Sequence, residues 1–377
     1  MQPNPQLRRV LATLDGLPAL TPADARRVGQ LIVGNPYLLE QFNRAAASGA
    51  LKGFAEEKDG WNAASFGGGM IRLVPSDLRP GYFDPMALTF LLGHEIQHAN
   101  DPALRTAFDT FIGAANAIAR SGTGVHDYTA PLVRYLDTKR DGEGLASIAG
   151  FNAVHAALVA KGIPPTVENM LRACPVDMAS FLDDARGPKR WDPSLRLAHD
   201  GSLQAVPGNV TVLNWRYFHA NDGGKDYDYL HKYASHALGY ALYNDRNVAM
   251  GAGRPPPRIV VDFRFLGLTA AELQLAGLAM DPPQRIYERP TDPSPSHVIG
   301  RRPESLLDEP VPSASGDAVA APSASVASVG RPVSLAGADG LTADAARALD
   351  AARASASIRE ADGHSGAIGD ALDVQAR

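Results

Sequence analysis

The feature that most constrains the fold is a predominantly apolar stretch, residues 84–101, that carries His94-Glu95-Ile96-Gln97-His98 near its end. Asp84 is an N-cap candidate with Pro85 at the first helical position, and apolar residues continue through Leu92. Residues four apart lie on one face of a helix, so the two imidazoles point the same way. Gly93, just before the first histidine, permits close packing. We therefore expect a buried helix that presents two histidines side by side.

Two imidazoles at this spacing can bind one zinc ion. Glu95 lies about 100° round the helix from His94, from where its carboxylate can reach a water on the metal without binding the metal itself. Zinc lowers the pKa of that water towards ~7, and the glutamate takes its proton before hydroxide attacks a polarised carbonyl. The motif predicts His94 and His98 as metal ligands and Glu95 as general base. The alternative is a surface helix with two solvated histidines.

Catalytic zinc requires a third protein ligand and one open position. Glu143 is the leading candidate, in Asp141-Gly142-Glu143-Gly144-Leu145-Ala146 inside a second long helical pattern. Glycine in a helix costs about 1 kcal/mol relative to alanine, so Gly142 and Gly144 indicate a compensating close approach to the first helix. The alternative is an exposed glutamate paired with Arg140 or Lys139. The other candidate third ligands are Asp101, Asp137, Asp141 and His126.

At this level of motif, residues 60–155 resemble the gluzincin branch of the HExxH metallopeptidases. That family pairs HExxH with a glutamate on a downstream helix, often as Glu-Gly-[Leu/Phe]-Ala, and Glu143-Gly144-Leu145-Ala146 fits. The interval of 45 positions from His98 to Glu143 is longer than in the best-known members. The resemblance implies a zincin-like fold, in which a small sheet precedes the HExxH helix and its edge strand binds extended substrate. The strand-like residues 65–75 occupy the matching place.

The resemblance also implies a Tyr or His that donates a hydrogen bond to the oxyanion formed opposite the metal. The candidates cluster in residues 227–236, and His231 is the one we carry forward. Two purely structural roles stay open for these residues. His231 and His236 can be satisfied surface or core histidines, and Tyr229 and Tyr233, four apart, can be packing residues.

The predicted fold class is α+β, with three regions along the chain. Residues 1–300 form a zincin-like, mostly helical metallohydrolase domain with a small sheet. Residues 301–340, rich in Pro, Ser and Ala, form a disordered linker, and 341–377 contain a short helix and a polar tail. Within the first region the patterns predict helices at 21–34, 36–49, 84–101, 103–120 and 131–161, strands at 64–78 and 258–268, and an irregular aromatic segment at 214–246.

Composition and charge limit the classes of partner that we expect. The formal net charge of −5 gives no electrostatic reason to expect a nucleic acid or an anionic membrane, and no window approaches the ~20 apolar residues of a membrane span. Cys174 is the single cysteine, so no internal disulfide can form. The N-terminus lacks the uninterrupted apolar core of a secretory signal. We expect a cytoplasmic protein, or one secreted by a route that does not use a signal peptide.

Together these patterns predict a zinc-dependent hydrolase, most simply a metallopeptidase that cleaves a peptide or related amide bond. Its expected cofactor is Zn²⁺ and its expected partner a peptide or protein substrate. The alternative is a secreted bacterial toxin or effector, with an immunity or secretion partner, whose zinc is structural or acts on a non-protein amide.

Overall fold

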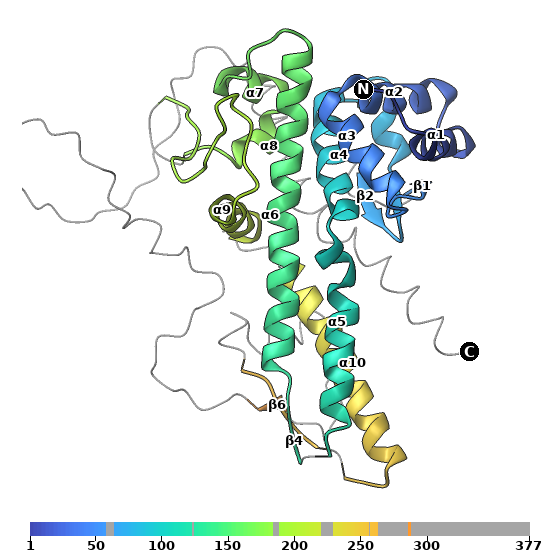
Figure 1. The fold of residues 1–377 in the computed structure, drawn as a ribbon, viewed down its shortest axis with the longest axis vertical. Helices are drawn as coiled ribbons and strands as arrows, with labels where there is room; N and C mark the ends of the chain where they lie inside the picture. The colour runs from blue at the N-terminus through green and yellow to red at the C-terminus, as the bar shows by residue number, and fades with distance from the viewer. Residues whose placement is uncertain are drawn as a thin grey trace, which may run out of the picture.

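The computed structural model describes residues 1–57, 64–122, 124–183, 188–219, 229–255, 257–262 and 286–287. The described chain is mostly helical and contains two small sheets, which confirms the α+β class (Figure 1). The segments predicted as linker and tail, 301–340 and 341–377, lie outside the described residues, as does the part of the predicted strand at 258–268 that follows residue 262.

Three short helices and a sheet form the N-terminal part. Each helix begins with a proline after a side-chain cap, and Thr21 and Asp24 form a reciprocal capping box at the second helix. The helices predicted at 21–34 and 36–49 are confirmed. The elements are α1 (Pro5–Ala12), η1 (Thr13–Gly16), α2 (Pro22–Gly34), α3 (Pro36–Ala47), β1 (Gly53–Glu56), β2 (Ala64–Gly67), β3 (Met70–Leu73) and η2 (Pro75–Leu78).

The stretch predicted as one strand at 64–78 is instead a hairpin followed by a 3₁₀ turn. Gly68 and Gly69 have φ of 62° and 83°, a conformation that favours glycine, and they turn the chain between β2 and β3. The strand order is β1-β3-β2, with β1 parallel and β2 antiparallel to β3. Strand β2 therefore lies at an edge of the sheet, and it packs beside the next helix, α4.

Three long helices form the centre of the molecule: α4 (Pro85–Asn100), α5 (Pro102–Ala119) and α6 (Thr129–Ala160). All three were predicted from the sequence. Pro102 separates α4 from α5, and both run along α6, which spans most of the length of the view in Figure 1. By length and composition α6 could cross a membrane, but 72% of its most apolar window is buried inside the protein. Such burial is typical of a core helix.

The remaining elements cover the other sides of α6. The prediction of an irregular segment at 214–246 is wrong for its described residues, which belong to the end of α9 and to most of α10. The inward face of α10 packs against α5 and α6. The second sheet has the order β4-β5-β6, with all three strands parallel. These elements are β4 (Val125–Asp127), α7 (Val167–Ala173), α8 (Pro175–Ala179), α9 (Pro207–His219), α10 (Tyr229–Gly251), β5 (Arg258–Val260) and β6 (Ile286–Tyr287).

Side chains of α6 enter all three hydrophobic clusters of the described residues. One cluster lies between the N-terminal helices, the first sheet and α4, and includes Ala153 of α6. A second joins α5, the first half of α6 and α10, and the third joins the second half of α6 to α7, α8 and α9. Glu143 lies on α6 between the residues that belong to the second and third clusters.

Candidate metal centre

Helix α4 brings three titratable side chains together in the interior. Asp84 caps the helix by accepting hydrogen bonds from the backbone N–H groups of Met86 and Ala87, which fixes where the helix begins. Ten residues later His94, Glu95 and His98 are all buried, at 8%, 4% and 5% exposure. Their potential ligand atoms all lie within 4.8 Å of one another. The reading of two solvated histidines on a surface helix is therefore wrong.

Glu143 of α6 reaches the same point from the facing helix. Its Oε2 lies 3.2 Å from Nε2 of His94 and 3.7 Å from Nε2 of His98. The residue is 2% exposed, so the alternative of an exposed glutamate paired with Arg140 or Lys139 is wrong. The four side chains form one buried cluster between α4 and α6.

Glycines allow the two helices to approach so closely. A Cβ on Gly93 would lie 2.7 Å from Cβ of Ala153 and 2.8 Å from the carbonyl oxygen of Ala149, both on α6. Gly150 of α6 faces the ring of Phe90 on α4 in the same way, at 2.8 Å. The small residues on both sides hold the α4 and α6 backbones close together, one turn or two from the cluster.

The prediction that the glycines beside Glu143 allow a close approach to the first helix is wrong. A Cβ on Gly144 would meet the carbonyl oxygen of Val210 on α9 at 2.6 Å, and one on Gly142 would meet Leu104 of α5 at 2.9 Å. Both glycines thus permit close packing, but against α9 and α5, not α4. They fix the rotation of α6 from its other sides, and this rotation directs Glu143 towards α4.

The donor set fits zinc. Two imidazole nitrogens and a carboxylate oxygen are ligands that zinc takes in catalytic sites, at about 2.0–2.2 Å. Ligands at that distance in a tetrahedron are roughly 3.4 Å apart. The two separations from Glu143 Oε2, 3.2 and 3.7 Å, lie on either side of this value. His94, His98 and Glu143 could hold the ion, with Glu95 beside it.

The four other candidate third ligands have different partners. Asp101 caps α5 through a hydrogen bond from the backbone N–H of Leu104, Asp137 pairs with Arg140, and Asp141 accepts a hydrogen bond from Asn214 of α9. His126 lies on β4, where its Nδ1 is 2.7 Å from a carboxylate oxygen of Asp245. The described partners of these four side chains are therefore other groups than the two histidines of α4.

The side chain of His231, the candidate oxyanion donor, lies outside the described residues, although its backbone belongs to α10. Within the same predicted group, His236 is half-buried, with its ring centroid 5.0 Å from that of Phe108. Tyr233 is 5% exposed, and burial together with the nearby carboxylates of Glu143 and Glu95 raises its pKa well above the ordinary value. Tyr233 is therefore the described member of the group that lies within electrostatic range of the cluster.

Two further side chains lie near the cluster, and no sequence pattern singled out either for this place. The ammonium of Lys139 contacts the rings of Tyr135 and Tyr233. Asp177 of α8 accepts a hydrogen bond from the Cys174 thiol at 2.9 Å; burial raises the pKa of this carboxyl, and the proximity of His94 opposes the rise. The one sequence signal available for either residue was the spacing of Lys139, which lies four positions before Glu143 on the same helix.

A scan against protein-family models, a search of curated proteins and a search of solved structures found no match to this chain.

Proposed function

We propose that this protein is a zinc metallopeptidase with a zincin-like catalytic region of the gluzincin type. The observation that supports this most is the position of Glu143, whose carboxylate oxygen lies 3.2 and 3.7 Å from the Nε2 atoms of the two histidines on the HExxH helix. Zinc would be held by His94, His98 and Glu143. This proposal combines a sequence motif with a contact between residues 45 positions apart, and a chance motif gives no reason for that contact.

A bound zinc ion would polarise a substrate carbonyl and acidify a water molecule. Glu95 would accept the proton of that water and pass it to the leaving amine, because its buried carboxylate lies close to both imidazoles. Tyr233 would donate a hydrogen bond to the oxyanion, because its buried side chain lies within electrostatic range of Glu143 and Glu95. His231, the donor expected from the sequence, stays a prediction because its side chain lies outside the described residues.

A peptide is the substrate that the neighbourhood of the site supports. Strand β2 pairs with β3 along one edge, and it packs beside α4. An extended peptide can add to the other edge of such a strand through backbone hydrogen bonds. Backbone pairing of this kind would bring a scissile amide alongside the helix that carries Glu95.

Replacing Glu95 by Gln tests the proposal. The amide fills the same space but cannot accept a proton, so the variant should keep its fold and zinc while turnover falls about 10²–10⁴-fold. The assay uses the zinc-loaded full chain and a defined mixture of decapeptides read by mass spectrometry. Glu40→Gln makes the same change on an exposed residue of α3 and should leave turnover unaltered. Full activity in Glu95→Gln would exclude this residue as the base.

A further inference from the structure

The ammonium of Lys139 is a cation held beside the candidate metal centre. Lys139 lies one helical turn before Glu143 on α6, so the two side chains share a face. Its Nζ lies 4.7 Å from the ring centroid of Tyr233 and 5.7 Å from that of Tyr135. The two rings are themselves packed edge to face at 6.2 Å. They form a rigid wall that fixes where the charge lies.

This wall is buried, while Lys139 is half-buried. Tyr135 and Tyr233 are 4% and 5% exposed and belong to the cluster that joins α5, α6 and α10. Burial lowers the pKa of Lys139, and the carboxylates of Glu143 and Asp101 oppose that change. A charge beside aromatic walls is poorly hydrated, so its attraction to an anion is stronger than in open water.

The described contacts of Lys139 do not use the N–H donors of its ammonium, so these donors can bind another group. An ammonium has three N–H donors, and a cation–π contact with a tyrosine face is worth about 0.5–2 kcal/mol. No carboxylate of the described residues lies within ion-pair distance of this ammonium; its described contacts are the two rings. Glu143 and Asp101 act on it from further away.

We propose that Lys139 binds a carboxylate of the substrate and makes the enzyme prefer peptides that carry this group close to the cleaved bond. The inference rests on the proposed function and adds the substrate class to it. The carboxylate has two sources, the free C-terminus of a peptide or an Asp or Glu side chain. Lys139 thereby positions the substrate and takes no part in proton transfer.

The test compares kcat/KM for matched peptides, using the zinc-loaded full chain. One arm pairs free-acid peptides with the same peptides as C-terminal amides, and the other pairs Asp or Glu with Asn or Gln next to the cleavage site. The wild type should prefer the carboxylate in one arm by about tenfold or more, the value for a hydrogen bond between charged groups. The difference in kcat/KM between the paired peptides should come from KM.

Lys139→Gln should abolish the preference, so that kcat/KM falls about tenfold or more further for the carboxylate-bearing peptides than for their neutral partners. Lys139→Met, which keeps apolar packing against the two rings, should do the same, and Lys139→Arg should retain part of it. Lys161→Gln removes an exposed lysine just beyond the far end of α6 and serves as the matched control. Zinc content and melting temperature are measured for each variant.

Three results would overturn the role of Lys139: a wild type with no preference in either arm, a preference that survives in both Lys139→Gln and Lys139→Met, or an equal loss on all peptides. The last of these would indicate that Lys139 only supports the structure. A zinc-loaded wild type that cleaves no peptide at all would overturn the proposed function itself.

Discussion

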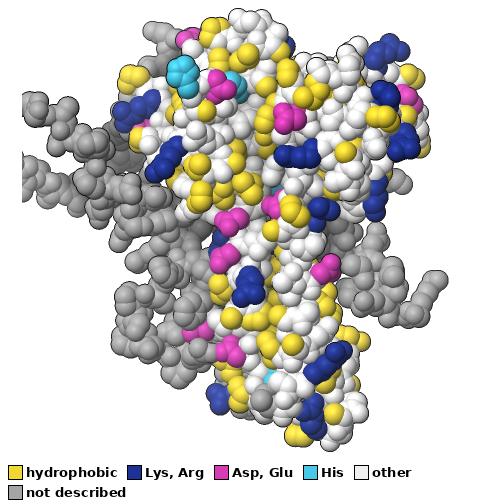
Figure 2. Space-filling model, viewed as in Figure 1, with side chains coloured by type: hydrophobic (Ala, Val, Ile, Leu, Met, Phe, Trp, Pro, Cys, Tyr) yellow, Lys and Arg dark blue, Asp and Glu magenta, His cyan; other side chains and the backbone are white. Residues whose placement is uncertain are grey.

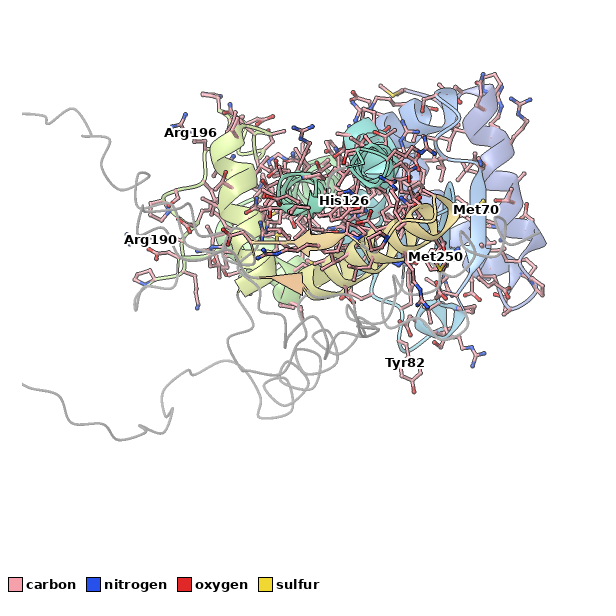
Figure 3. All side chains as sticks on the ribbon, turned by 90° about the horizontal axis from the view of Figure 1, so that it is seen from below. Met70, Tyr82, His126, Arg190, Arg196 and Met250 are labelled. Carbon is pink, nitrogen blue, oxygen red and sulfur yellow. The ribbon has the colours of Figure 1, made fainter. Side chains whose placement is uncertain are left out.

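At the scale of single residues, the buried histidines divide by the partners they meet. His94 and His98 meet Glu143, whereas His126 lies against Asp245, whose second oxygen accepts a hydrogen bond from Tyr128 at 2.7 Å. In Figure 3, which is seen from below, His126 lies near the centre of the view, at the end of the molecule where Figure 1 shows β4. The Asp245 side chain is fully buried, so losing a partner leaves a charge in the interior.

This division predicts that the loss of His126 affects stability and leaves zinc binding intact. His126→Ala should lower the free energy of unfolding by roughly 3 kcal/mol, because it breaks a buried pair, and should leave zinc content unchanged. His199→Ala, at an exposed position, should change neither quantity. Urea denaturation and elemental analysis measure the two effects. Loss of zinc from His126→Ala would show that this histidine belongs to the metal centre.

At the scale of elements, the site depends on how closely α6 packs against α4 and α9. The positions that a side chain would fill are Gly93 on α4 and Gly144 on α6, where the opposing atoms include backbone carbonyl oxygens that cannot move without shifting a helix. Gly113 of α5 is helical as well, but a Cβ there would meet nothing within 4 Å. The three glycines therefore allow a matched comparison of alanine substitutions.

Gly93→Ala and Gly144→Ala should each destabilise the protein by about 1–3 kcal/mol through overpacking. Gly113→Ala should be neutral or stabilise by about 0.5–1 kcal/mol, since alanine is the better helix former. Gly93→Ala should also weaken zinc retention, because it displaces the helix that carries both histidines. Equal stability of all three variants in urea would contradict the close packing described above.

At the scale of the whole molecule, α6 connects the three hydrophobic clusters, and the candidate metal centre lies where the second half of α4 packs beside the middle of α6. On the face seen in Figure 2, acidic and basic side chains both occur along the molecule. A metal held by α4 and α6 would join the N-terminal part to this central helix. Zinc binding would then stabilise the fold as a whole.

Local sequence signals account for the parts of the fold and of the candidate site that could be predicted. The Asp84 cap and Pro85 located the start of α4, and the HExxH spacing placed two histidines on one face of that helix. The contact between Glu143 and those histidines was predicted from the need for a third ligand, from the glycines beside Glu143 and from the family motif. The 44 residues between His98 and Glu143 give no geometric constraint of their own. The error at 214–246 has a physical reason: aromatic residues and Gly223-Gly224 have low helix propensity, and the apolar face of α10 becomes stable only against α5 and α6.

The most direct test of the central claim is anomalous diffraction at the zinc edge from crystals grown with zinc. The account predicts one strong peak per chain, with Nε2 of His94, Nε2 of His98 and a carboxylate oxygen of Glu143 all at about 2.0–2.2 Å from it. A zinc ion bound elsewhere with Glu143 turned away, or no peak at saturating zinc, would contradict it.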